Sequence, residues 1–160
     1  MKITSPLPTY MNITGILSNY VLIAALAAWA LAQIIKIPLE YIRTRRWNWA
    51  LLLSTGGMPS SHSALVASAA HGTGLFAGFD SPVFALAVAL AMVVIYDATG
   101  IRRQAGRHAT LLNAIIRDLA SGHPLKEEQL REVLGHTPLQ AFGGTLLGIL
   151  IAQLGWMVWR

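Results

Sequence analysis

Four long apolar stretches, separated by polar or charged segments, dominate the chain. They cover residues 16–35, 63–79, 83–96 and 138–159. A helix needs roughly 20 apolar residues to cross the hydrocarbon core of a bilayer, and these stretches reach or approach that length. The pattern predicts an all-α fold, a polytopic membrane helix bundle with about four transmembrane helices.

The second stretch differs from the others because small and polar residues fill it, among them Ser63, Ser68, His71 and Gly72. Small residues let helix backbones approach closely in a membrane, so this helix is expected to face protein and not lipid. A histidine at membrane depth needs an internal partner or water. We expect His71 to make a structural hydrogen bond or, failing that, to line a site.

The segments between the stretches predict shorter elements. Trp47 and Trp49 stand beside arginines within residues 37–53, which is typical of a helix or turn at the headgroup level. Residues 104–135 read as an amphipathic cytoplasmic excursion that ends in a short charged helix over residues 125–134. Thr137 and Gln140 have the spacing of a capping box at the start of the last stretch.

Composition agrees with a membrane protein. The chain has 160 residues, 54% of them apolar and 12% charged, and a mean hydropathy of +0.53. This length predicts one domain, here residues 1–160, but such hydropathy is wrong for a soluble one. The net charge of +5 does not indicate nucleic-acid binding, because spanning-length apolar runs separate the basic residues. The absence of cysteine excludes disulfides, thiolate nucleophiles and cysteine-ligated metals.

The positions of the positive charges predict an orientation. Ten of the twelve Lys and Arg residues lie in the two segments after the first and third stretches, and only Lys2 and Arg160 lie outside them. The positive-inside rule makes these segments cytoplasmic and both termini extracytoplasmic, in what we expect to be a bacterial plasma membrane. Four polar clusters then share the cytoplasmic face: Lys36 with Arg43, Pro59 to His62, Asp97 with Arg102 and Arg103, and His136 with Gln140.

The uncharged stretch from Gly56 to Ser63 stands out among these clusters. Its glycines permit close approach of the backbone to a ligand, and Pro59 is suited to open a helix at its first turn. Ser60, Ser61 and His62 follow directly. A helix N-terminus with hydroxyls is a plausible cradle for a phosphoryl group.

The other clusters supply what metal-free phosphoryl transfer requires. Lys36, Arg43 and either Arg102 or Arg103 could neutralise phosphate charge. Of two histidines, His62 and His136, one could attack phosphorus and the other protonate the leaving oxygen. Asp97 stands alone at this depth, so no carboxylate cluster predicts a magnesium site, and we expect no metal or other cofactor.

These residues resemble two motifs of the phosphatidic acid phosphatase type 2 superfamily, which also contains the vanadium haloperoxidases. Lys36 and Arg43 have the spacing of its Lys-x6-Arg-Pro motif, with Thr44 in place of the proline. Pro59-Ser60-Ser61-His62 is similar to its Pro-Ser-Gly-His motif. From about residue 15 to 155 the chain looks like the divergent branch of small membrane proteins in this superfamily.

Two partial matches compete for the third motif, Ser-Arg-x5-His-x3-Asp. Arg102 with His108 has the Arg-x5-His spacing, but Leu112 stands where the aspartate belongs. His136 with Gln140 is similar to the His-x3-Asp part, and this second match is preferred because it puts the histidine at the mouth of a spanning helix.

The resemblance implies a metal-independent lipid-phosphate phosphohydrolase that acts at the cytoplasmic face through a phosphohistidine. Phosphatidic acid, phosphatidylglycerophosphate and isoprenoid phosphates or diphosphates are the implied substrates. His136 would be the nucleophile, His62 the general acid, and the phosphate ligands would be Lys36, Arg43, Ser60, Ser61 and Arg102 or Arg103. Gln140 would orient His136 without offsetting its charge, unless Asp97 or a glutamate of residues 127–132 substitutes.

A second interpretation stays open. Gln140 in place of an acid also fits a non-catalytic membrane protein whose anion pocket binds lipid headgroups or a partner. In either case membrane lipids are the expected surroundings, nucleic acid is not an expected partner, and the glycine-bearing helix faces would permit a homo-oligomer.

Overall fold

The computed structural model describes residues 13–53, 56–120 and 136–159, and within these ranges every regular element is a helix. This confirms the predicted all-α class. In chain order the elements are η1 (Ile13–Ser18), α1 (Tyr20–Thr44), η2 (Trp49–Leu53), α2 (Ser61–Ala77), α3 (Pro82–Thr99), α4 (Ile101–Ala120) and α5 (Pro138–Trp159).

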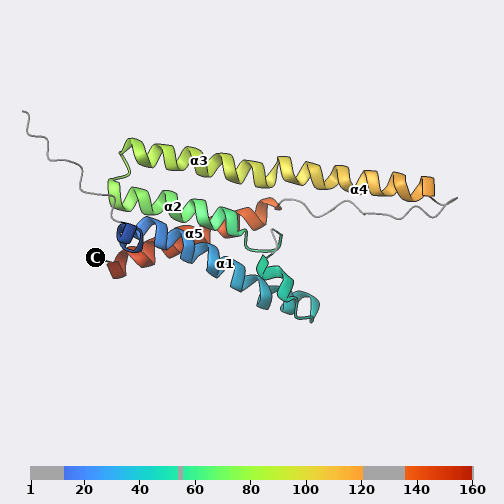
Figure 1. Ribbon diagram of the computed structural model, residues 1–160, viewed down its shortest axis with the longest axis horizontal. Coiled ribbons are helices and arrows are strands. Elements are labelled where there is room, and N and C mark those ends of the chain that lie inside the picture. The colour runs from blue at the N-terminus through green and yellow to red at the C-terminus, as the bar shows by residue number, and fades with distance from the viewer. Residues whose placement is uncertain (1–12, 54–55, 121–135, 160) are drawn as a thin grey trace, which may run out of the picture.

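The helices α1, α2, α3 and α5 form a bundle in which α2 contacts the other three, antiparallel to α1 and α3 and parallel to α5 (Figure 1). The buried positions of α2 are all Ser, Ala or Gly. The prediction that this helix faces protein is therefore confirmed, and its small side chains explain how it fits between three neighbours.

Three helical stretches of the described chain are long and apolar enough to cross a membrane: Tyr20–Thr44, Pro82–Arg117 and Pro138–Trp159. The fourth predicted span, α2, has 17 residues and runs beside them. Large apolar side chains such as Leu86, Leu90 and Leu150 are exposed on the outside of the bundle. Lipid accommodates such side chains, and the chain is an integral membrane protein.

The predicted end of the first helix near residue 35 is wrong, because α1 continues through Pro38 to Thr44. Proline removes one helical hydrogen bond, yet apolar residues continue on both sides of it. The helix ends where Arg45 adopts a left-handed conformation, with φ of 57°, and donates its N–H to Tyr41 O at 2.8 Å. Of the predicted interfacial segment, only η2 is a separate helix.

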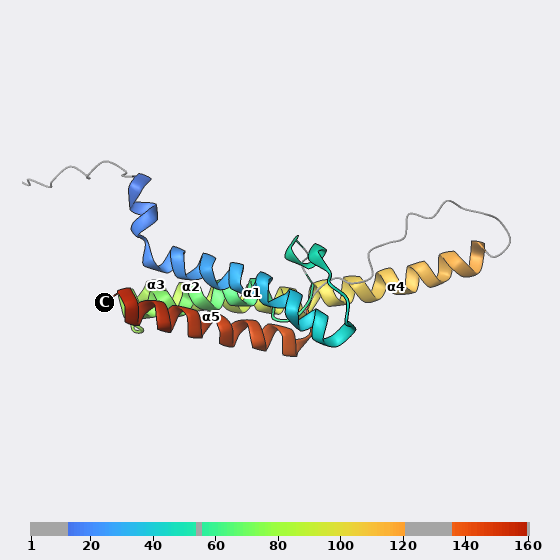
Figure 2. The same ribbon diagram turned by 90° about the horizontal axis from the view of Figure 1, so that it is seen from below.

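The third helix also ends later than expected. The helix α3 runs to Thr99, Gly100 follows, and α4 continues in nearly the same direction past the end of the bundle (Figures 1 and 2). The expected amphipathic excursion is thus helical as far as Ala120. The short helix predicted over residues 125–134 lies outside the described residues.

Close contact between α2 and α5 holds the centre of the bundle together. A Cβ atom on Gly144 would collide with the carbonyl oxygen of Ser60, and one on Gly148 would lie 2.9 Å from the backbone nitrogen of Ser68. His71 bonds Gln153 of α5 at 3.0 Å. This confirms the expected internal hydrogen bond for a histidine at membrane depth.

Candidate functional site

One end of the bundle gathers the polar groups singled out from the sequence. The N-termini of α2 and α5, the C-terminus of α3 and the C-terminal half of α1 all lie at this end (Figure 1). His62, Asp97, His136 and Lys36 belong to these four segments. Because α1 and α3 end where α2 and α5 begin, the fold brings these residues to one level of the molecule.

A tight turn leads into α2. Gly57 has φ of 88°, a value that favours glycine, and the Met58–Pro59 peptide bond is cis. Ser60 is the N-cap of α2, with its side chain accepting a hydrogen bond from the N–H of Ser63 at 3.2 Å. The expectation that Pro59 would be the first helical residue is wrong, because Ser60 separates it from the helix.

Backbone contacts tie this turn to α5. Ser60 donates its N–H to the carbonyl oxygen of Gln140 at 2.9 Å, and the Ser63 hydroxyl donates to the Ser60 hydroxyl at 3.1 Å. Ser60, Ser61 and Ser63 are all buried. The N-terminus of α2 is thus fixed beside the start of α5, and the positive end of its dipole favours an anion there.

Lys36 brings a cation to the same turn. Its side chain is 1% exposed, its Nζ donates to Oε1 of Gln33, and its Cδ lies 3.4 Å from where a Cβ of Gly57 would stand. A buried ammonium is costly and commonly marks a functional site in a membrane protein. Sequence reasoning missed Gln33, although its position three residues before Lys36 is a helical neighbour spacing.

The other predicted phosphate-binding cations belong to α1 and α4. Arg43 lies about two turns after Lys36 on α1 and is exposed. Arg102 and Arg103 belong to the first turn of α4, next to the C-terminus of α3. Their binding of phosphate stays a prediction.

His62, in the first turn of α2, and His136, just before α5, lie close together. The ring centroids of His62 and His136 are 6.0 Å apart with an interplanar angle of 54°. His136 is 2% exposed and donates its backbone N–H to the carbonyl oxygen of Ala98 at 2.8 Å. That bond fixes the start of α5 against the end of α3.

Asp97 lies near the C-terminus of α3, at the same end of the bundle as His62 and His136. It lines a cavity of about 200 Å³ together with His62, Val93, Val94 and Ala98. It also precedes Ala98, which accepts the His136 backbone bond. The Asp97 carboxyl group therefore lines the same cavity as His62, and its neighbour in sequence anchors His136.

The side chain of Gln140 caps the N-terminus of α5. Its Oε1 accepts the N–H of Thr137 at 2.9 Å, and its own N–H donates to the Thr137 hydroxyl at 3.3 Å. The predicted capping box is confirmed. This engages the side-chain oxygen of Gln140, and the orienting roles expected of Gln140 or Asp97 stay predictions.

His108, the alternative nucleophile, lies on α4 and is exposed. It lines a different cavity, of about 480 Å³, with Tyr96, Gly100 and Gln104 among its neighbours. The histidine pair of the bundle is His62 with His136, which favours the second of the two partial matches to the third motif.

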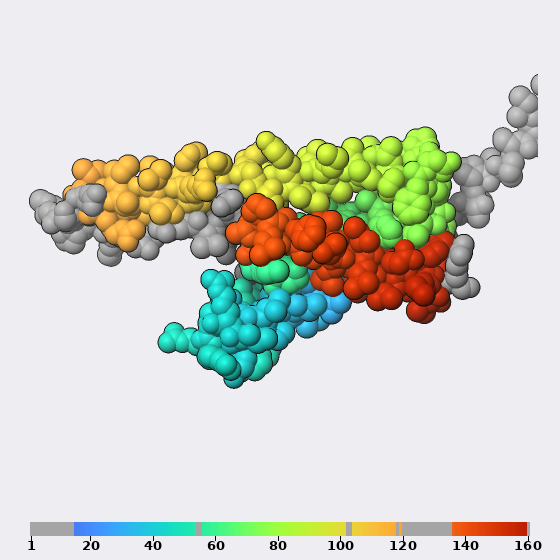
Figure 3. Space-filling view, turned by 180° about the vertical axis from the view of Figure 1, so that it is seen from behind, coloured from blue at the N-terminus to red at the C-terminus, as the bar shows by residue number. Residues whose placement is uncertain are grey.

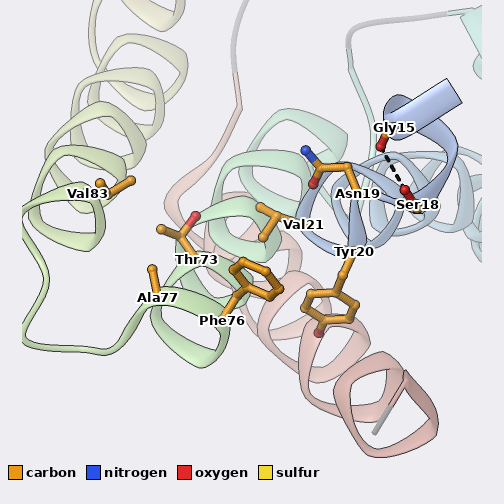
Figure 4. A pocket seen from close by; sticks show the side chains of 9 residues that line it. All are labelled: Gly15, Ser18, Asn19, Tyr20, Val21, Thr73, Phe76, Ala77 and Val83. Carbon is orange, nitrogen blue, oxygen red and sulfur yellow. Dashed lines mark hydrogen bonds between the residues drawn. The ribbon is translucent and has the colours of Figure 1, made fainter. Parts of the chain in front are cut away.

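A further cavity of about 370 Å³ lies at the opposite end of the bundle, where α2 ends (Figure 4). Asn19, Val21, Thr73 and Phe76 are among its lining residues. Tyr20 also lines it, but its hydroxyl donates to the carbonyl oxygen of Ala152. The described residues that line this cavity include no charged or imidazole group, which phosphate chemistry needs, so the other end is the candidate site.

Comparison with known proteins gives a consistent picture. Residues 17–151 match the divergent PAP2 family. An uncharacterized membrane protein, YuiD of Bacillus subtilis (strain 168), is 42% identical over 147 residues, which cover 85% of this chain and 93% of YuiD. No solved structure matches the chain.

Proposed function

Since the chain belongs to the divergent PAP2 family, we propose that it hydrolyses lipid phosphates without a metal ion, through a phosphohistidine intermediate. The substrate class is a phosphate ester of a membrane lipid, such as phosphatidic acid, phosphatidylglycerophosphate or an isoprenoid phosphate or diphosphate. The charge pattern of the sequence supports a site at the cytoplasmic face with both termini on the other side.

The proximity of two imidazoles is the observation that carries this proposal. Metal-free transfer through a phosphohistidine needs one imidazole as nucleophile and a general acid within reach of the same phosphoryl group. The ring centroids of His62 and His136 are 6.0 Å apart, at the end of the bundle that also holds the N-terminus of α2 and the buried Lys36. A phosphoryl group bound at this histidine pair would meet the backbone donors of the α2 N-terminus.

In the first step, an imidazole nitrogen of His136 attacks phosphorus and the bond from phosphorus to the lipid oxygen breaks. Protonated His62 gives its proton to the leaving oxygen, so the lipid departs as a neutral alcohol, or as a monophosphate from a diphosphate substrate. Lys36, with Arg43 and Arg102 or Arg103, neutralises the phosphoryl oxygens.

In the second step, water attacks the phosphohistidine while neutral His62 accepts the proton of the water. Inorganic phosphate leaves and His136 is regenerated. Asp97 stabilises the imidazolium form and holds the imidazoles in position, the role that a carboxylate plays beside a catalytic histidine.

Phosphate release from purified protein in detergent tests the proposal. The wild-type protein and the His62→Ala variant would receive phosphatidic acid, phosphatidylglycerophosphate and an isoprenoid diphosphate, each with excess chelator. We expect the wild-type protein to release phosphate from at least one lipid and the variant to be slower by about 10²-fold or more.

Equal release by the two proteins, or loss of release on adding chelator, would refute the proposed mechanism. Absence of release together with tight binding of the same lipids would support the non-catalytic anion-pocket interpretation instead.

A further inference from the structure

The helix α4 has one apolar face that is exposed. Leu112, Ile115 and Leu119 repeat at helical spacing and are 47%, 53% and 76% exposed, whereas Asn113 on another face is 4% exposed. An ordinary surface helix buries its apolar side and exposes its polar side. In α4 the apolar side is the one that remains available to a partner.

The position of α4 relates this face to the membrane. It follows α3 directly and extends beyond the end of α5 (Figures 2 and 3). The stretch Pro82–Arg117 has 36 residues, roughly 54 Å of helix, against a hydrocarbon core of roughly 30 Å. The surplus lies in α4, so α4 begins near the boundary of the bilayer.

Gly100 stands where the two helices meet. Its φ and ψ of −97° and −81° depart from helical values, and its N–H donates to Tyr96 O at 2.7 Å. Glycine at a junction between helices permits a change of direction at little steric cost. In the structure α4 continues nearly in line with α3, and a change of direction at Gly100 would lay α4 along the membrane surface.

The charge of α4 identifies the kind of surface. Its sequence holds four arginines and one aspartate, and Arg107 and Arg117 are exposed away from the apolar face. A basic helix with an apolar face is the pattern that binds an anionic membrane surface. We propose that α4 lies in the headgroup region of the membrane, with Leu112, Ile115 and Leu119 inserted among acyl chains and its arginines near anionic lipid phosphates.

Site-specific fluorescence in the full-length protein tests this placement, independently of any catalysis. The chain has no cysteine, so Leu112→Cys and the matched control Ala114→Cys, also exposed but on another face, can each carry one environment-sensitive fluorophore. The proteins would be placed singly in nanodiscs of phosphatidylcholine with or without phosphatidylglycerol. A nitroxide near the top of the lipid acyl chains would quench fluorophores that enter the bilayer.

We expect several-fold stronger lipid quenching at position 112 than at position 114, and stronger quenching with phosphatidylglycerol. Adding Arg107→Glu to the Leu112→Cys protein should reduce quenching in the anionic nanodiscs.

Equal quenching at the two positions would overturn the proposal. So would a fluorophore at position 112 that is shielded from aqueous iodide but not quenched by the lipid nitroxide, since protein would then cover the face. Quenching at position 112 that is indifferent to phosphatidylglycerol and to Arg107→Glu would overturn the assignment of an anionic surface.

Discussion

Burial of a charged side chain is the most informative feature at the scale of single residues. Lys36 is 1% exposed and lies against the Gly57 turn. Proteins place an ammonium in such surroundings at a cost to stability, and an anionic ligand offsets that cost when it binds. Lys36 is therefore expected to serve binding and not folding.

Replacing Lys36 with methionine tests this expectation. Methionine has a similar length without the charge, so the Lys36→Met protein should have a Tm equal to or above that of the wild-type protein in detergent. Phosphate release should fall by about 10²-fold or more because a phosphate ligand is lost. A lower Tm with unchanged release would show that Lys36 is structural.

Asp97 lines the same cavity as His62, whereas the Gln140 side chain bonds Thr137, so substitutions at the two positions should have different effects. Asp97→Asn should reduce phosphate release by about 10²-fold or more, because the imidazolium loses its carboxylate. Gln140→Glu retains the capping box, so its turnover should stay within about threefold of the wild-type value. Steady-state release at saturating lipid measures both, and a large gain with Gln140→Glu would return the orienting role to position 140.

The sequence identified the chemical groups better than their partners. His62, His136 and Lys36 follow from motif spacing, and the capping box of Thr137 and Gln140 follows from local helix chemistry. The bond of Lys36 to Gln33, and those of Ser60 to Gln140 and of His136 to Ala98, were not predicted. Two of them join different helices through the backbone, which carries no residue-specific signal.

At the scale of elements, packing between α2 and α5 decides the geometry of the candidate site. Gly144 touches the Ser60 carbonyl oxygen, whereas a Cβ on the neighbouring Gly143 would lie 3.4 Å from Cε of the flexible Met58. Gly144→Ala should therefore lower stability by about 1–3 kcal/mol and reduce phosphate release by displacing Ser60. Gly143→Ala is the matched control and should change both little, as thermal unfolding and phosphate release would show.

Similar losses from Gly143→Ala and Gly144→Ala would contradict this account of the contact between α2 and α5. The small residues of α2 predicted close packing from sequence. The exact ends of α1 and α3 were mispredicted, because charged residues mark where a chain meets water and not where its helix stops.

Topology is the property of the whole molecule that the chemistry depends on. The bundle places the N-terminus of α2 and the C-terminal half of α1 at one end and the α2–α3 turn at the other (Figure 1). Single cysteines at Arg46 and Asp80, both exposed, should accordingly label from opposite sides of the membrane. We expect an impermeant thiol reagent to reach position 80 in intact cells and position 46 only after permeabilisation, and the reverse result would invert the proposed orientation.

The central claim is that His62 and His136 form the reaction centre, and the choice between His136 and His108 tests it most directly. Phosphate release would be compared for the wild-type, His136→Ala and His108→Ala proteins on the lipid that the wild-type protein hydrolyses best. We expect the rate of phosphate release to fall by at least about 10²-fold in His136→Ala and to stay within about threefold of the wild-type rate in His108→Ala. Retention of activity by His136→Ala, with loss in His108→Ala, would contradict it.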